Sequence, residues 1–166
     1  IWHGDIASVL PNREDITFFA SGVSNSQETR GTEYEREEHL LLDQFGITKH
    51  IVYFGSLSVF YSDSRYAKHK RHMEELVKTF PRYTIVRIGN ITWGSNPNTL
   101  INHFKAMANS GEPLDIQDTK RYVVEKEEFL HWINLIPDWN CEMNIPGRMM
   151  TIQEIVDKYV APHFHA

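Results

Sequence analysis

The amino-acid sequence predicts an α/β fold built around a mainly parallel sheet. Apolar segments of strand length alternate with amphipathic segments of helix length along most of the 166 residues. This alternation is typical of strand–helix–strand units, and the length fits one domain with a single hydrophobic core. In such folds, ligands bind beyond the carboxyl ends of the strands. We therefore expect functional residues in segments 20–26, 55–62 and 88–96.

Apolar runs rich in aromatic and β-branched residues predict the strands. Three longer runs predict buried strands, "DITFFAS" (15–21), "KHIVYFGS" (49–56) and "RYTIVRIGN" (82–90). Three shorter runs predict further strands, "PLDI" (113–116), "RYVV" (121–124) and "EMNIPG" (142–147).

The segments between these runs predict helices at 32–46, 63–80, 97–111, 126–136 and 151–160. Thr32 with Glu35, and Thr151 with Glu154, have the spacing of a capping box, which marks the start of a helix. The acidic run "EYEREEH" (33–39) is interpreted as a solvated helix face.

Composition excludes several classes of function. The net charge of −5 argues against broad nucleic-acid binding. The lone Cys141 cannot form an internal disulfide, and no Cys/His cluster predicts a metal site. No apolar run approaches the roughly 20 residues that a membrane span requires. A cytoplasmic protein without a membrane partner is the expectation.

The stretch "SDSRYAKHKRHMEEL" (62–76) places Tyr66 and Lys70 four residues apart on a predicted helix, so both project from one face. A nearby ammonium stabilises the phenolate form of a tyrosine, which then serves as a general acid or base beside a carbinol or carbonyl. Ser56 and Ser58 follow the preceding strand and could polarise the same oxygen. The alternative is that the pair belongs to a solvated basic helix face.

The segment "HIVYFGSLSVFYSDSRYAKHKRHMEELV", followed by "YTIVRIGNITWG", resembles the short-chain dehydrogenase/reductase superfamily. The branch it resembles is the extended one, that of nucleotide-sugar epimerases and dehydratases. In that pattern a strand ends in two serines, a Tyr-x-x-x-Lys helix follows, and a later strand ends in Arg-x-x-Asn-x-x-Gly. Weaker similarity in "ITFFASGVSNS", "KRYVVEKEEFLHWI" and "CEMNIPGRMMTIQEIVDKY" extends the resemblance over about residues 15–160.

The resemblance implies a Rossmann-like three-layer fold, abbreviated in its N-terminal half. It implies one domain over residues 1–166, in which about 95–166 contain a reduced substrate-binding lobe. It further implies NAD or NADP as cofactor and an oxidoreductase, epimerase or dehydratase reaction on a sugar or nucleotide-sugar-like substrate. A homodimer through a four-helix bundle is a further option.

The resemblance also assigns roles to residues. Tyr66 would be the acid/base, Lys70 would bond the nicotinamide ribose, and Ser56 would bond the substrate oxygen. The residues implied at the cofactor are Gly4, Ile6, Ala20, Ser21, Tyr66 and Lys70. Those implied at the substrate are Ser58, Asn90, Trp93 and Arg121. Asn90 could instead be a satisfied turn residue, and Arg121 could be a surface ion-pair residue.

The N-terminus departs from the family pattern, which has a first strand and a glycine-rich turn that opens a helix under the pyrophosphate. "GDIASVL" (4–10) resembles the later part of that turn, with Ala7 in place of a glycine. Alternatively, it corresponds to a Gly-Asp-Ile segment after the family's third strand, with the preceding half absent. The first interpretation is favoured by residue size and polarity. Because the adenosine end is poorly provided for, the alternative function is a non-catalytic binding or assembly module.

Overall fold

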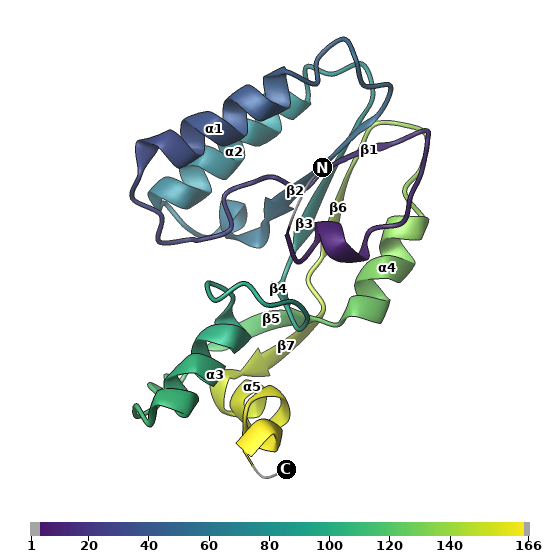
Figure 1. Ribbon diagram of the computed structural model, residues 1–166. Coiled ribbons are helices and arrows are strands. Elements are labelled where there is room, and N and C mark those ends of the chain that lie inside the picture. Colours follow the sequence, from purple (N-terminus) through teal and green to yellow (C-terminus); the bar gives the residue numbers. More distant parts are fainter. Residues whose placement is uncertain (1–3, 165–166) are drawn as a thin grey trace.

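The computed structural model describes residues 4–164 and contains two small sheets (Figure 1). Sheet A has four strands, all parallel, in the order β1-β2-β3-β6. These strands are β1 (Thr17–Phe19), β2 (Ile51–Ser56), β3 (Tyr83–Ile88) and β6 (Cys141–Ile145). Sheet B has three strands in the order β4-β5-β7, and β7 runs antiparallel to β5. Its strands are β4 (Asn90–Ile91), β5 (Lys120–Val124) and β7 (Arg148–Thr151).

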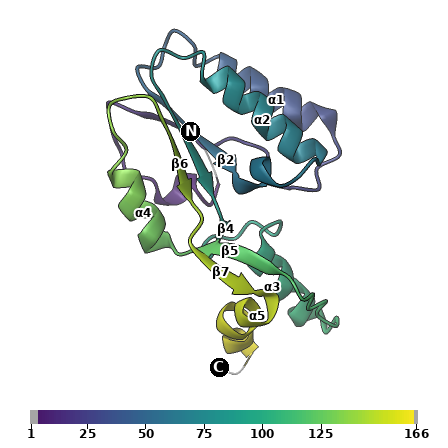
Figure 2. The same cartoon turned by 180° about the vertical axis from the view of Figure 1, so that it is seen from behind.

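Helices cover both faces of sheet A. Helices α1 (Gly31–Leu42) and α2 (Arg65–Val77) lie side by side on one face, and α4 (Lys126–Asn134) lies on the other (Figures 1 and 2). The first face is sealed by a cluster that includes Leu41, Met73 and Val77. The second is sealed by Phe129 and Ile133, with the partly buried N-terminal segment packed beside them. The expected α/β fold with a parallel sheet between helical layers is confirmed.

Sheet B forms a smaller unit with two further helices, α3 (Leu100–Ser110) and α5 (Ile152–Tyr159). Their apolar faces pack on β5 and β7 in a third buried cluster, in which Phe104, Val123 and Ile155 take part. This unit is not a continuous C-terminal segment, because α4 and β6 return from it to sheet A (Figure 2).

Of the two capping boxes that the sequence predicts, one is formed and the other is not. At α5, the Thr151 side chain and Glu154 form the predicted capping box. At α1, the predicted box of Thr32 and Glu35 is wrong, because the helix already begins at Gly31 and its N-cap makes no side-chain bond. Thr32 therefore lies inside the first turn.

One strand prediction is wrong, and one strand was not predicted. The segment 113–116 was expected to be a strand but has no strand structure, whereas β7 was not predicted. Three short 3-10 turns complete the described chain, η1 (Ala7–Val9), η2 (Leu57–Phe60) and η3 (Ala161–Phe164). No helix within residues 4–164 is long and apolar enough to cross a lipid bilayer.

Candidate active site

Strand β2 delivers Ser56 to the carboxyl end of sheet A. Five buried residues precede it in the strand, and Ser56 itself is half-buried. Its hydroxyl accepts a hydrogen bond of 3.2 Å from the Ser58 backbone N–H and lies 2.9 Å from the Ser58 hydroxyl. The two predicted serines therefore contact each other in the turn that leads out of the strand.

Helix α2 begins nine residues after β2 and carries Tyr66 and Lys70. Its N-cap is Ser64, whose side chain accepts a bond from the Ala67 N–H. The Lys70 ammonium lies over the Tyr66 ring, 5.5 Å from its centroid. Tyr66 is half-buried, whereas Lys70 is 2% exposed. The predicted sharing of one helix face is confirmed, and the lysine side of the pair points into the protein.

The ammonium of Lys70 lies next to a buried carboxylate that was not predicted as part of the site. Lys70 Nζ donates a bond of 2.8 Å to Glu37 Oε1. The Tyr53 hydroxyl donates to the same oxygen at 2.7 Å, and the Val23 N–H donates to Oε2 at 2.8 Å. His69 Nε2 lies 3.0 Å from Oε2. Glu37 thus ties α1, α2, β2 and the loop after β1 to one point.

The opposite charges of Lys70 and Glu37 stabilise each other. Burial alone raises the pKa of Glu37, but the Lys70 charge and the bonds from His69, Lys70 and Val23 hold that pKa well below its usual range. Burial lowers the pKa of Lys70, but the charge and hydrogen bond of Glu37, together with the nearby Tyr66 and Tyr34, raise this pKa overall. Both groups are therefore ionised at neutral pH.

Sequence reasoning missed Glu37 because it belongs to the acidic run 33–39. A usable signal existed, since Tyr34, Glu37 and Leu41 are spaced by three and four residues and share one helix face. Leu41 lies on the apolar stripe, so Glu37 beside it faces the core.

The loop after β1 brings Ala20 and Ser21 to the same edge of sheet A. The next residue, Gly22, contacts the ion pair so closely that a Cβ there would lie 2.7 Å from Lys70 Nζ and 2.8 Å from Glu37 Oε1. The Ser21 carbonyl accepts a long bond of 3.4 Å from Arg36. The residue that follows Ser21 in this loop therefore lies beside Lys70 of α2.

The N-terminal segment differs from the favoured sequence interpretation. Residues 1–3 lie outside the described residues, and after Gly4 the chain forms only the 3-10 turn Ala7–Val9. The expected helix under a pyrophosphate is absent from the described segment 4–16. Ile6 packs against the core cluster of the α4 face, and Gly4 lies near the Ala20 carbonyl.

Asp5 fastens this segment to the loop after β4. Its carboxylate accepts bonds from the Ser95 and Asn96 N–H groups at 3.0 and 2.9 Å. The Trp93 indole donates a bond of 2.9 Å to the Asp5 carbonyl, and its ring packs on Phe129 at 5.2 Å. Trp93, predicted at the substrate, therefore has a clear structural role at this junction.

Asn90 and Arg121 belong to sheet B. The Asn90 amide donates a bond of 2.9 Å to the Tyr122 carbonyl and so joins β4 to β5; Asn90 lies in a strand and not in a turn. Arg121 is exposed on β5, where its guanidinium bonds the Lys120 carbonyl. Neither of these two hydrogen bonds involves Tyr66 or Lys70.

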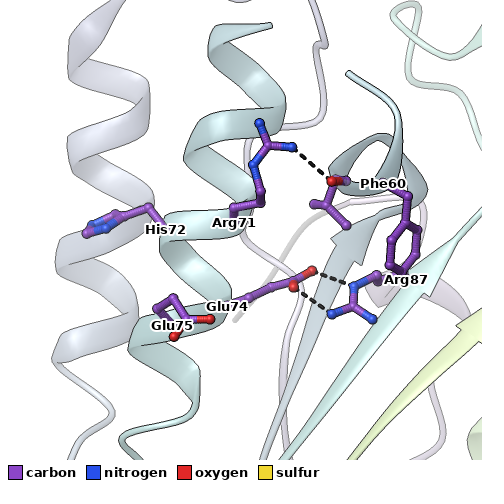
Figure 3. Close-up of a pocket in the computed structure, with 7 residues that line it drawn as sticks. Phe60, Arg71, His72, Glu74, Glu75 and Arg87 are labelled. Atoms are coloured by element: carbon purple, nitrogen blue, oxygen red, sulfur yellow. Dashed lines mark hydrogen bonds and ion pairs between the residues drawn. The ribbon is translucent and has the colours of Figure 1, made fainter. Parts of the chain in front are cut away.

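Two open hollows lie near the carboxyl end of β2. One, of about 450 Å³, lies between η2 and α2 and is bordered by Phe60, Arg71 and Arg87 (Figure 3). Its Arg87 is held by Glu74 at 2.6 Å and Glu142 at 2.7 Å, so this guanidinium is already neutralised. The other, of about 320 Å³, is lined by residues that include Tyr61, Tyr122 and Asn144. Neither hollow is lined by Ser56, Tyr66 or Lys70.

The sequence matches no protein-family model and no curated protein sequence. Solved structures do match the fold. The enzyme WbmG of Bordetella bronchiseptica, in complex with NAD, matches 92% of this chain with 14% identity and a TM-score of 0.67. A UDP-galactose 4-epimerase matches 87% of this chain with 13% identity and a TM-score of 0.68. UDP-N-acetylglucosamine 4-epimerase from Bacillus cereus matches 84% with 19% identity and a TM-score of 0.58.

The chain spans only part of these proteins, covering 56% of WbmG, 61% of the UDP-galactose epimerase and 58% of the Bacillus epimerase. At these identities the match concerns the fold, and fold alone does not establish function. The expected Rossmann-like architecture and the resemblance stated from the sequence are confirmed at that level. The chain therefore has the fold that the matched part of these three solved enzymes has.

Proposed function

We propose that this chain belongs to an NAD(P)-dependent oxidoreductase, epimerase or dehydratase that acts on a sugar or nucleotide-sugar-like substrate. The observation that carries the proposal is the position of the Lys70 ammonium, buried 5.5 Å from the Tyr66 ring centroid at the carboxyl edge of sheet A. The named activities of two solved relatives, both 4-epimerases of UDP-sugars, support the substrate class.

The residues present fit the nicotinamide end of such a cofactor. Gly22 brings backbone next to Lys70 without a side chain in the way, and Ala20 and Ser21 border the same edge. An ammonium has three N–H donors, so its bond to Glu37 leaves others for a ribose hydroxyl. The pyrophosphate end fits less well, because η1 is too short to present a helix N-terminus.

In the proposed reaction Tyr66 exchanges a proton with a hydroxyl or carbonyl oxygen of the substrate. Lys70 holds its positive charge beside the Tyr66 ring, and Ser56 bonds the same substrate oxygen. A bound nicotinamide would supply the hydride chemistry. Asn90, Trp93 and Arg121 remain proposed substrate residues, and dimerisation through α1 and α2 remains a proposal.

A titration with NADH and NADPH, followed by cofactor fluorescence, tests whether the protein binds the proposed cofactor. We expect saturable binding of at least one of the two nucleotides. The Lys70→Met/Glu37→Gln double variant removes both charges together, so no buried charge is left unpaired. We expect this variant to bind more weakly than Lys68→Met, which changes an exposed lysine on the same helix. Equal binding by both variants would contradict the assignment of Lys70.

The Tyr66→Phe variant tests the proposed role of Tyr66 as the acid/base. It removes the hydroxyl but keeps the ring, so nucleotide binding should survive while turnover of UDP-sugars is lost. Tyr61→Phe is the matched control, because Tyr61 is 75% exposed and lies outside the proposed pair. Unchanged turnover in Tyr66→Phe would exclude Tyr66 as the acid/base.

One observation favours the second candidate, a non-catalytic binding or assembly module. The segment that should hold the pyrophosphate is instead fastened by Asp5 to the loop of Ser95 and Asn96. The module hypothesis predicts a folded protein that binds neither NADH nor NADPH, which is the opposite outcome of the titration above.

A further inference from the structure

Glu37 is a charged side chain that lies entirely inside the protein. Its exposure is 0%, and four groups surround its two oxygens. Oε1 receives bonds from Lys70 and Tyr53, while Oε2 receives the Val23 N–H and lies beside His69. A buried carboxylate is costly unless it is paired and fully hydrogen-bonded. Here the four groups that offset this cost come from three separate segments, namely the loop after β1, strand β2 and helix α2.

The cluster lies at the proposed reaction site. Its ammonium is 5.5 Å from the Tyr66 ring centroid and 5.4 Å from that of Tyr53. Gly22, in the loop that would border a cofactor, touches both members of the ion pair. Any displacement of Lys70 toward solvent would break its bond to Glu37.

Resting on the function proposed above, we infer that Glu37 is a positioning residue, which holds Lys70 in the ammonium form beneath the Tyr66 ring. The hydrogen bonds of Glu37 go to Lys70, Tyr53 and Val23, and its other close partner is His69, so Glu37 faces the Tyr66 ring only through Lys70. It acts through Lys70, and His69 and Tyr53 hold its carboxylate in place.

The charge of Glu37 is what opposes the desolvation of Lys70. Burial lowers the pKa of Lys70, and the attraction of Glu37 is the largest influence in the other direction. With a neutral glutamine at position 37, desolvation would dominate and Lys70 would lose its proton at a lower pH. The titratable groups that face Lys70 are Tyr34 and Glu37 from α1, Tyr53 from β2, and Tyr66 and His69 from α2.

The protonation of Lys70 can be measured directly by NMR of the 13Cε resonances of lysine. In the wild type we expect Lys70 to remain mostly protonated at about pH 10.4, the ordinary midpoint for lysine. In Glu37→Gln we expect its midpoint to move down by at least a pH unit. Glu37→Asp keeps the charge and should restore part of the shift.

Glu38→Gln is the matched control, because Glu38 is the next residue on α1 and pairs with the exposed His72. It should leave the Lys70 titration unchanged. A wild-type Lys70 that is already deprotonated at pH 10.4 would overturn the inference, and this result needs no variant. The same holds for a Glu37→Gln protein in which the Lys70 midpoint does not move.

A second readout separates a positioning role from a merely structural one. If Lys70 must be charged, the alkaline limb of the pH–rate profile should shift to lower pH in Glu37→Gln, with kcat more affected than KM. A uniform loss at every pH would contradict the inference. If the wild type neither binds NAD(P)H nor turns over a sugar nucleotide, the proposed function fails, while the Lys70 titration still decides the role of Glu37.

Discussion

Lys70 and Glu37 form an ion pair of 2.8 Å whose side chains are 2% and 0% exposed, and this pair joins helix α2 to helix α1 beneath Tyr66. The basic residues of α2 therefore do not all lie on one solvated face, as the alternative interpretation of the sequence expects. Lys68 points to solvent, whereas Lys70 is part of the interior. The interior position keeps an ammonium next to a phenol in surroundings where charge interactions are stronger than in water.

Removal of one partner of this pair should destabilise the fold. Glu37→Gln leaves a buried ammonium without its counter-charge, which costs about 3–5 kcal/mol in comparable cases. Glu38→Gln should cost less than about 1 kcal/mol, because its pair with His72 is exposed. Urea unfolding monitored by circular dichroism measures both. Similar losses in the two variants would show that the buried pair is not formed. Replacement of both partners, in Lys70→Met/Glu37→Gln, should recover part of the loss.

Acidification should destabilise the protein through His50. This side chain is 3% exposed and lies 2.9 Å from the Thr84 hydroxyl. Burial, followed by the charge of Arg82, lowers the pKa of His50. The unfolded chain therefore binds the proton more readily, and stability is lost as the pH falls below about 6.5, the ordinary value for histidine.

The free energy of unfolding of wild type and His50→Gln, measured between pH 7.5 and 5, tests this assignment. The wild type should lose stability over that window, and the variant should lose less. Protonation of Glu37 also destabilises the fold, but at lower pH. Because the pKa of Glu37 is depressed in the folded protein, its contribution to stability is lost only below about pH 4.3. Identical slopes for both proteins above pH 5 would rule out His50 as the cause.

Gly22→Ala should disturb the candidate site without a change of charge. A Cβ at this position would lie 2.7 Å from Lys70 Nζ and 2.8 Å from Glu37 Oε1, so the pair must move. We expect a loss of about 1–3 kcal/mol, as for overpacking, and weaker NAD(P)H binding. Gly4→Ala is the control, because its nearest neighbour would be the Ala20 carbonyl at 4.0 Å. Equal stability of the two variants would contradict the close approach.

Leu41→Ala and Leu42→Ala test which face of α1 is buried. Leu41 is 0% exposed within the cluster between α1, α2 and sheet A, whereas Leu42 is 41% exposed. The first substitution should cost about 2–5 kcal/mol and the second much less. Denaturant titration measures the difference, and a larger loss at Leu42 would mean that α1 presents another face to the sheet or is covered by a second chain.

The strands of the main sheet and the Tyr66–Lys70 geometry could be predicted because they depend on local periodicity. The runs at β2 and β3 are mostly apolar and are buried over most of their length, and two residues four apart on a helix must share a face. Strand β7 could not be recognised, because "RMMT" has no clear alternation of apolar and polar residues.

Glu37 shows why the rest of the site was not predicted. Its partner Lys70 lies 33 residues away in the sequence, and only the packing of α1 against α2 brings the two together. An acidic run is solvated in most helices, so composition favours the wrong interpretation for this residue. The capping prediction at Thr32 failed for a related reason. The helix starts at Gly31, one residue before Thr32, and no side-chain cap bond is formed at its start.

The measurement that tests the central claim most directly is a titration of the 15N-labelled protein with NADH, followed by backbone amide shifts. We predict that the shifts cluster at Ser21, Gly22, Ser56 and Tyr66, around the Lys70–Glu37 pair. Amides of the exposed Trp132 and Trp139 should stay unchanged and serve as internal controls. The absence of shifts with both NADH and NADPH, or shifts confined to residues away from this edge of sheet A, would contradict the account.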